Sequence, residues 1–501
     1  MFRLLSLAAL LLAACLPARA APGPAWHPFE CPWRLESARA VECGVLEVPE
    51  NWARADSRTI LLHVRILRAP KPYGLPPVIY LSGGPGQDMA FTTAEEMEDW
   101  LYYAEAFMGW AEGRDIILFS QRGILVDGVG MECPELGDPR TYLGAAETPD
   151  DLTDPLESLP RAEAACRARL AAEGYDLAAY TTTQSARDVA ALREALGIPE
   201  WVLFGVSYGS RLGLTLMRNH PEGVAAAIFD SVFPPEITDH WHDASAFAQA
   251  LDTLFANCAR MRRCARAYPG LESRLDALLA RLAREPLVLW VEDRSGENPR
   301  LYIKLDDVLL LDMIFFKLYW IDDIEELPRG IDALDRGDID LFRELIASDY
   351  VFDTLFYGWS YGMQTAITCN DDHAWFDPGR VRTEMRAFPR FANWLGASLL
   401  LPSCGGWPAQ PRDSGFSAPV ASGIPTLLLT GEYDPVTPPR YAERALAHLP
   451  NGRLVVVRGV AHAVLDAAPC ARALVREFLA APARALPATC GLGRPPIFAL
   501  P

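Results

Sequence analysis

Hydrophobic residues gather in short, uninterrupted runs along this chain, and most runs are followed by a stretch with helical periodicity. The runs lie at residues 77–81, 115–119, 200–204, 224–229, 426–430 and 454–457. Apolar runs this short are typical of strands that are buried on both faces of a sheet. Thr59–Leu67 instead alternates between apolar and polar residues, as expected for a strand with one exposed face.

The stretches between these runs predict helices. They lie at residues 94–110, 185–197, 208–219 and 440–449. Ser185 with Asp188 three residues later is typical of a helix N-terminus. Strands that alternate with helices predict an α/β fold, in which helices cover both faces of a mostly parallel sheet.

Between residues 232 and 423 the pattern changes. Helical periodicity dominates, aromatic residues are frequent, and prolines and cysteines punctuate the segment. We interpret it as a large insertion into the α/β domain. The expected organisation is a leader at residues 1–20, a first part of the core at 21–233, a mainly helical cap at 234–422 and the rest of the core at 423–501.

The first twenty residues have the pattern of an export signal. A positive start precedes an apolar run at residues 4–14, which is too short to span a bilayer. Residues 18–20 (Ala-Arg-Ala) form a small-x-small cleavage site, whereas residues 12–15 (Leu-Ala-Ala-Cys) resemble a lipobox with Cys15 as the lipidated residue. Both kinds of processing stay open, and both predict an exported protein, periplasmic or extracellular. No later run of 18 apolar residues lacks charges or prolines, so we expect no transmembrane helix.

Composition narrows the class of partner. Lysine plus arginine number 46 and aspartate plus glutamate 65, which gives the 501 residues a net charge of −19. This acidic balance argues against nucleic acid as a partner, because phosphate backbones attract basic surfaces. A hydrophobic fraction of 50% supplies a sizeable core and excludes a disordered, collagen-like or coiled-coil chain.

Eleven cysteines support export to an oxidising compartment. Apart from Cys15 they fall into close-spaced couples, for which we expect five disulfides. The couples are Cys31/Cys43, Cys133/Cys166, Cys258/Cys264, Cys369/Cys404 and Cys470/Cys490. Ten cysteines allow many connectivities, so the pairing stays open. The sequence has no Cys-x-x-Cys and no histidine at ligand spacing from a cysteine pair, and we expect neither a metal site nor a cofactor.

Residues 205–209 (Gly-Val-Ser-Tyr-Gly) carry the pattern Gly-x-Ser-x-Gly between a predicted strand and a predicted helix. In that context the serine sits in a strained turn that lifts its hydroxyl above the sheet. Side chains two positions before and after it would meet neighbouring backbone, which explains both glycines. Ser207 is therefore the candidate nucleophile.

A serine nucleophile needs a histidine base that is oriented by a carboxylate. In this type of fold the chain order is serine, acid, histidine. Asp434 follows the strand at residues 426–430, and His462 follows the strand at residues 454–457. Glu432 is the alternative acid. His448 falls in a predicted helix and is expected at the surface.

Acyl transfer also needs donors for the developing oxyanion. One expected donor is the backbone N–H of Tyr208. The other should come from the glycine-rich turn at residues 82–86, where Gly84 is the first choice and Gly83 the alternative.

Together these motifs resemble the secreted bacterial α/β-hydrolases of the prolyl/tripeptidyl aminopeptidase family. The matching segments are residues 31–33, 42–49, 83–86 (Gly-Gly-Pro-Gly), 121–123 (Gln-Arg-Gly), 205–209, 431–438 and 459–462, with Cys404, residues 407–408 and Cys470/Cys490 similar to that family's TAP-like C-terminal region. The resemblance covers most of the chain after the leader. It implies a serine peptidase that acts on free N-termini under a helical cap.

Two positions depart from the family pattern. Ser120 stands where the family usually has an aspartate, and residues 369–372 (Cys-Asn-Asp-Asp) replace a frequent Cys-x-Glu-Asp. A carboxylate above the nucleophile would bind a substrate ammonium by a charge-assisted hydrogen bond, and Asp371 and Asp372 are the candidates. The alternative is a helix-end or solvated acidic pair. The aromatic residues 357–361 would line a side-chain pocket or belong to the core of the cap.

We therefore expect a Ser-His-Asp hydrolase whose substrates are peptides with a free N-terminus. An esterase or amidase on small acyl substrates is the alternative, because the same triad serves both and the pocket decides. A carboxylate that faces Ser207 would favour the peptidase. A non-catalytic binding protein is the minor alternative, against which the intact Ser207, Asp434 and His462 argue.

Overall fold

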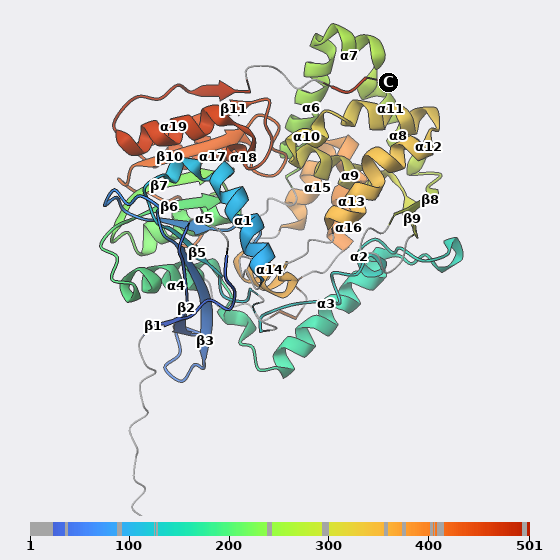
Figure 1. Ribbon diagram of the computed structural model, residues 1–501. Coiled ribbons are helices and arrows are strands. Elements are labelled where there is room, and N and C mark those ends of the chain that lie inside the picture. Colours follow the sequence, from blue (N-terminus) through green and yellow to red (C-terminus); the bar gives the residue numbers. More distant parts are fainter. Residues whose placement is uncertain are drawn as a thin grey trace, which may run out of the picture.

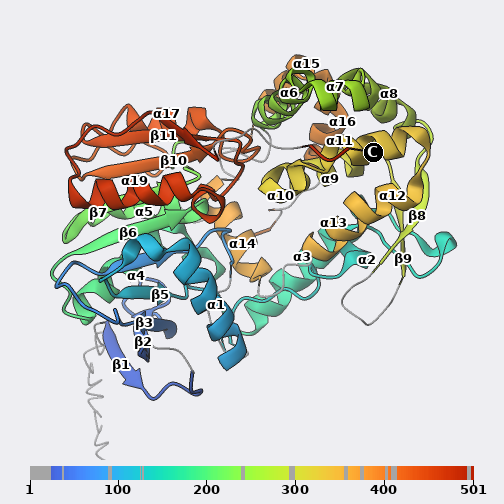
Figure 2. The same ribbon diagram turned by 45° about the horizontal axis from the view of Figure 1, so that its top comes forward.

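The computed structural model describes residues 24–35, 39–87, 93–124, 126, 129–237, 243–292, 300–354, 359–372, 377–400, 404, 406–407, 415–492 and 498–500. The expected leader and Cys15 lie outside these residues. The chain forms two adjoining bodies, a sheet flanked by helices and a mostly helical cap (Figure 1). Figure 2 shows the same two bodies from a second direction.

Ten of the described strands form one sheet, in the order β1-β2-β3-β5-β4-β6-β7-β10-β11-β12. They are β1 (Ala25–Phe29), β2 (Val41–Pro49), β3 (Thr59–Leu67), β4 (Val78–Leu81), β5 (Ile116–Phe119), β6 (Trp201–Val206), β7 (Val224–Asp230), β10 (Thr426–Gly431), β11 (Gly452–Arg458) and β12 (Thr489–Gly491). The first three strands are antiparallel to their neighbours, and all pairs from β5 to β12 are parallel. The expected mostly parallel sheet is thus confirmed.

Helices cover both faces of this sheet. One face carries α1 (Ala94–Phe107) and α19 (Pro469–Ala480), and the other carries α4 (Thr182–Ala195), α5 (Tyr208–Asn219) and α17 (Pro439–Leu446). Successive residues of β6 enter the two cores in turn, because side chains alternate along a strand. Leu203 packs with α4 and α5, and Phe204 packs with α1.

The cap has a hydrophobic core of its own. Its helices are α6 (Ala244–Arg260), α7 (Arg262–Ala267), α8 (Leu271–Leu282), α9 (Asp307–Tyr319), α10 (Ile321–Ile324), α11 (Leu327–Arg336), α12 (Ile339–Phe342), α13 (Ser348–Thr354), α15 (Pro378–Ala387) and α16 (Ala392–Leu400). The helix α14 (Tyr361–Ile367) belongs to the same segment of the chain but packs with the core on one face of the sheet. These elements fall inside the expected segment of residues 234–422. Among the described residues, no helix combines the length and the hydropathy needed to span a bilayer.

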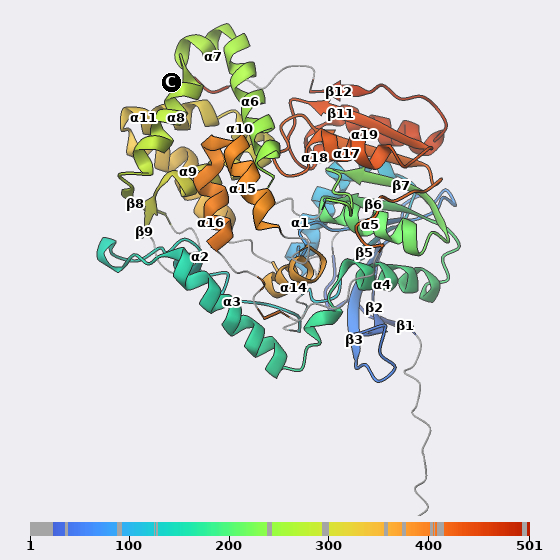
Figure 3. The same ribbon diagram turned by 180° about the vertical axis from the view of Figure 1, so that it is seen from behind.

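Two helices that lie beside the cap precede Ser207 in the chain, an arrangement that the sequence did not predict. The short α2 (Pro139–Tyr142) and the long α3 (Pro155–Ala172) lie along the cap rather than on the sheet (Figure 3). Ala146 exchanges two backbone hydrogen bonds with Tyr302, of 3.0 and 2.7 Å. Tyr302 belongs to an antiparallel hairpin, β8 (Leu287–Val291) and β9 (Leu301–Leu305), which helical periodicity also did not predict.

The start of α4 corrects one sequence interpretation. The helix begins at Thr182, and the side chain of Thr181 caps it by accepting a hydrogen bond from Gln184 N. Ser185 is buried inside the helix. Thr181 is thus the N-cap, and the side chain of Gln184 instead accepts a hydrogen bond from Trp52 N at 3.0 Å.

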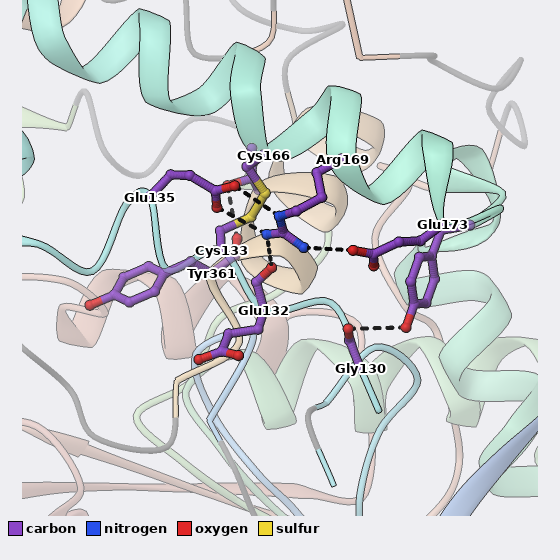
Figure 4. Close-up of a disulfide and its surroundings, with 10 residues drawn as sticks. Gly130, Glu132, Cys133, Glu135, Cys166, Arg169, Glu173 and Tyr361 are labelled. Atoms are coloured by element: carbon purple, nitrogen blue, oxygen red, sulfur yellow. Dashed lines mark hydrogen bonds and ion pairs between the residues drawn. A yellow bond between two sulfur atoms is a disulfide. The ribbon is translucent and has the colours of Figure 1, made fainter. Parts of the chain in front are cut away.

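All ten described cysteines form disulfides. The pairs are Cys31–Cys43, Cys133–Cys166, Cys258–Cys264, Cys369–Cys404 and Cys470–Cys490, the couples that sequence proximity suggested. Figure 4 shows how Cys133–Cys166 joins α3 to the loop that precedes it. Beside this disulfide, Arg169 bonds both carboxylate oxygens of Glu135, at 2.8 and 2.9 Å. These links fix one face of α3.

Candidate active site

Ser207 occupies the sharp turn between β6 and α5. Its φ of 56° and ψ of −122° lie in a backbone region that residues other than glycine rarely adopt. A Cβ on Gly205 would overlap the carbonyl oxygen of Gly209, and a Cβ on Gly209 would overlap that of Leu81. Both glycines are thus required by close backbone approach, as the motif predicts.

Asp434 and His462 meet at the ends of the neighbouring strands β10 and β11. Nδ1 of His462 lies 2.8 Å from Oδ2 of Asp434, and both side chains are buried. Asp434 also accepts hydrogen bonds from the backbone N–H groups of Val436 and Thr437 and from the Thr437 hydroxyl, at 2.9, 2.8 and 2.6 Å. The pair has the geometry of a base and its orienting acid.

The electrostatics keep Asp434 ionised. Burial by itself raises the pKa of this carboxyl, but the charge and hydrogen bond of His462 and the bonds from Thr437 outweigh it, so the pKa falls below the ordinary value. Glu432, the alternative acid, instead accepts a hydrogen bond from Gly459 N at 2.9 Å.

The cap contributes a residue that sequence reasoning missed, Tyr319 at the end of α9. Its ring stacks on the imidazole of His462 with centroids 4.3 Å apart, and its carbonyl oxygen accepts a hydrogen bond from His462 N at 3.2 Å. Burial raises the pKa of the Tyr319 phenol, and the charge of Asp434 adds to the rise. Nε2 of His462 has no hydrogen-bond partner among the described residues. Tyr319 thus packs on the base and lines the same cavity as the nucleophile.

The loop after His462 is anchored to β7. Oδ1 and Oδ2 of Asp230 each accept a 2.9 Å hydrogen bond, from Val464 N and Leu465 N, and Ala463 N donates to the Ser231 hydroxyl at 2.8 Å. Burial raises the pKa of Asp230 to about 7, although these two backbone donors oppose the rise. Because Ala463 has a positive φ of 56°, the anchor holds a strained residue next to the histidine.

The glycine-rich turn lies against the nucleophile. A Cβ on Gly83 would sit 3.4 Å from the Ser207 Cβ, and Gly84 lines the same cavity as Ser207. The N–H of Gly83 already donates to the Gln87 side chain at 3.2 Å. This use of Gly83 favours Gly84, with Tyr208 at the first position of α5, as the expected oxyanion donors.

Residues 121–123 lie next to the glycine-rich turn and are hydrogen-bonded to it. Nε2 of Gln121 donates to both the carbonyl and the hydroxyl of Ser82 at 3.0 Å. Arg122 is fully buried and binds both carboxylate oxygens of Asp188 at 2.7 Å. The Gln-Arg-Gly motif is therefore structural, and Ser120, the departure from the family pattern, donates its backbone N–H to His63 O at 2.9 Å.

The side chains of Asp371 and Asp372 bind other parts of the fold rather than the triad. Asp371 accepts a 2.9 Å hydrogen bond from Thr182 N at the start of α4, and Asp372 forms a buried ion pair with Arg211 at 2.9 Å. Neither lines the cavity at Ser207. The structure thus brings the predicted triad together but does not bring these two carboxylates to it.

A cavity of about 340 Å³ opens above Ser207, and both the cap and the segments before the nucleophile line it. Its lining is Gly84, Leu136, Tyr142, Leu159, Glu163, Ser207, Phe233, Phe315, Phe316, Tyr319, Trp359, Tyr361, Gln364, Thr365 and Val436. From the predicted aromatic segment, Trp359 and Tyr361 do line it. Glu163 of α3 is its one carboxylate among the described residues, and no motif in the sequence marks it. A wider hollow of about 580 Å³ lies within the cap and touches no member of the triad.

Comparisons with known proteins agree with this geometry. Residues 76–269 match the family model described as alpha/beta hydrolase fold, and residues 391–490 match the one described as TAP-like protein. Tripeptidyl aminopeptidase of Streptomyces lividans is 25% identical over 509 residues, which cover 93% of this chain and 86% of that protein.

Two further relatives match in part. Serine protease Hip1 of Mycobacterium tuberculosis is 25% identical over 313 residues, 58% of this chain, so the chain spans only 57% of that protein's length. Proline iminopeptidase of Arabidopsis thaliana is 42% identical over 53 residues, 11% of this chain and 14% of that protein. With the family matches and the parallel sheet, the chain has the α/β-hydrolase fold, and its residues 391–490 are similar to the TAP-like region.

Proposed function

We propose that the protein is an exported serine peptidase that releases residues or short peptides from free N-termini. The observation that carries the proposal is the hydrogen-bonded pair His462–Asp434 beside Ser207, whose strained turn opens into a capped cavity. Relatives named tripeptidyl aminopeptidase, serine protease and proline iminopeptidase support peptide substrates.

The reaction would proceed through an acyl-enzyme. His462 Nε2 takes the hydroxyl proton while Ser207 Oγ attacks the scissile carbonyl carbon. The backbone N–H groups of Tyr208 and Gly84 hold the oxyanion, and Asp434 fixes the imidazole tautomer. The C–N bond then breaks as His462 returns the proton to the leaving amine. Water hydrolyses the ester by the same proton transfers, which restores the serine hydroxyl.

An esterase or amidase is the second candidate. The cavity walls are largely aromatic and aliphatic, which also suits an apolar acyl group. The same three residues would carry out that reaction unchanged, so only the contacts of the cavity with the substrate separate the two functions.

Export rests on two supports. Five disulfides are compatible with an oxidising compartment, and the first twenty residues have the pattern of a leader. We propose a periplasmic or extracellular location, either soluble from Ala21 or anchored by a lipid on Cys15. The mass of the N-terminal peptide of the protein purified from its host distinguishes these forms.

The test of the proposed function is a three-substrate assay on the purified protein. It compares a chromogenic amide with a free α-amine, the same amide after N-acetylation, and a p-nitrophenyl ester. We expect turnover of the free-amine amide, with Ser207→Ala inactive as the control. Ester turnover without amide turnover would replace the peptidase by the esterase, and full activity in Ser207→Ala would end both readings.

A further inference from the structure

Glu163 is a carboxylate in an otherwise uncharged cavity. It lies on α3 and shares the lining with Ser207, while its neighbours there are aromatic, aliphatic or neutral polar side chains. Among the described residues no hydrogen bond or ion pair of Glu163 is recorded, whereas Asp371 and Asp372 both have fixed partners. An ionised carboxylate that is half-buried in apolar surroundings is unfavourable unless a cation or a hydrogen-bond donor binds it.

The surroundings affect the charge of Glu163 directly. Burial raises the pKa of this carboxyl to about 7, and the guanidinium of Arg167, one turn along α3, only partly opposes the rise. The fold therefore holds Glu163 in a place where its ionised form lacks compensation. A cationic ligand in the cavity would supply that compensation.

The fold does not need Glu163 to position α3. Cys166, three residues later on the same side of the helix, is joined to Cys133, and Arg169 binds Glu135 (Figure 4). The N-terminus of α3 is capped separately by Asp154, which accepts a hydrogen bond from Leu156 N at 2.9 Å. These contacts fix the helix and leave Glu163 to face the cavity.

We propose that Glu163 binds the N-terminal ammonium of the substrate. The substrates are then peptides with a free N-terminus whose first residue has an uncharged side chain. This proposal rests on the proposed function and goes beyond it by naming the residue that selects the free N-terminus. Ion pairing to a carboxylate provides the attraction, and the aromatic residues Tyr361 and Trp359 in the lining are of the type that attracts cations. The apolar walls would then surround the side chain of the first residue.

The test compares Glu163→Gln with a matched control on the same helix, Glu157→Gln, whose side chain is exposed in the first turn of α3. Each variant is assayed with phenylalanine p-nitroanilide and its N-acetyl form, and with the corresponding ester pair. We expect kcat/KM for the free-amine substrates to fall about 10- to 100-fold in Glu163→Gln through a higher KM. Both acetylated substrates should change less than about twofold.

The outcomes separate this proposal from the proposed function. If the wild type hydrolyses free-amine amides and Glu163→Gln keeps the same preference for the free amine, Glu163 does not bind the ammonium although the peptidase stands. If the wild type hydrolyses only esters, the peptidase fails, and the ester pair still decides whether Glu163 selects the amine. Equal rates for free and acetylated substrates in the wild type would overturn the proposal with either leaving group.

A folding defect would be recognised separately. Glu163→Gln removes a poorly compensated buried charge, so its melting temperature should equal or exceed that of the wild type. Glu163→Asp, which keeps the charge, should recover part of the free-amine preference. A lowered melting temperature in Glu163→Gln, together with equal losses on free and acetylated substrates, would assign Glu163 a structural role and contradict the proposal.

Discussion

The sheet and the cap contribute to the same cavity in different ways. The sheet places Ser207, Asp434 and His462 at the ends of the parallel strands β6, β10 and β11, each in a short loop with local constraints. The cap and α3 supply Tyr319 and Glu163 from helices that are distant in the sequence. In the proposed function, the reaction chemistry depends on loops at one edge of the sheet, whereas selection of the substrate depends on how separate helices pack together.

This difference predicts which changes affect every substrate and which affect only some. A change in the strand loops should slow all hydrolysis equally. A change in α3 should alter the ratio between substrates. Tyr319 lies between the two groups, because it belongs to the cap but contacts His462 and lines the same cavity as Ser207.

The largest effect is expected for Asp434→Asn. The amide would favour the wrong tautomer of His462, and kcat should fall on the order of 10⁴-fold for free-amine, acetylated and ester substrates alike. Glu432→Gln, on the same loop, is the control and should stay within about threefold of wild type. A selective loss on one substrate class in Asp434→Asn would mean that the triad does not act on all of them.

Next in size is the removal of a disulfide. Replacing both Cys133 and Cys166 by alanine should lower the free energy of unfolding by about 2–4 kcal/mol, and so should replacing both Cys470 and Cys490. Only the first pair fixes the helix that carries Glu163. Denaturation curves should therefore show similar losses, while assays show a weaker free-amine preference for the first double variant alone. An equal free-amine preference in the two double variants would show that the position of α3 does not affect substrate selection.

A smaller effect is expected for Tyr319→Phe. The change removes a hydroxyl from a residue that shares the cavity with Ser207 but keeps the ring on His462, so kcat should fall about 3- to 10-fold with KM unchanged. Tyr175→Phe is the control, because its hydroxyl donates a hydrogen bond to Gly130 O at 3.0 Å rather than to the triad. A change in KM without a change in kcat would place Tyr319 among the binding residues instead.

The smallest expected effect is a pH dependence of KM. Because the pKa of Glu163 is raised to about 7, the carboxylate is neutral below that pH and charged above it. KM for free-amine substrates should therefore rise severalfold as the pH falls from about 7.5 to 6, since each pH unit below the pKa reduces the charged fraction about tenfold.

The other ionisable groups near Glu163 should not titrate in this range. Burial raises the pKa values of the Tyr142 and Tyr319 phenols above their ordinary values; the guanidinium of Arg167 acts on Glu163 from the same helix, and Tyr361 lines the same cavity. Glu163→Gln should abolish the change in KM. Persistence of the change in this variant would assign it to another group.

The sequence predicted the parts of the molecule that local constraints determine. The turn at Ser207 follows from two glycines and a strand–helix junction, and the places of Asp434 and His462 follow from the order of the buried strands. The parallel sheet follows from short apolar runs. Each of these signals lies within a few residues of the feature that it predicts.

The sequence could not predict features that depend on distant partners. Asp371 suggested a ligand site, but its partner, Thr182 N, lies 189 positions earlier in the chain. Glu163 sits in a helix with many charged residues, and only packing against the cap distinguishes it from its exposed neighbours. In the sequence Tyr319 is one of many aromatic residues of the helical insertion, and only the fold places it against His462.

The most direct measurement is covalent labelling of the active site in the presence of competing ligands. The protein is treated with a fluorophosphonate, the modified residue is located by peptide mass mapping, and the labelling rate is measured with phenylalanine amide or its N-acetyl form present. The account predicts one label, on Ser207, whose formation is slowed by the free-amine compound but not by the acetylated one. A label on another residue, or equal protection by both compounds, would contradict it.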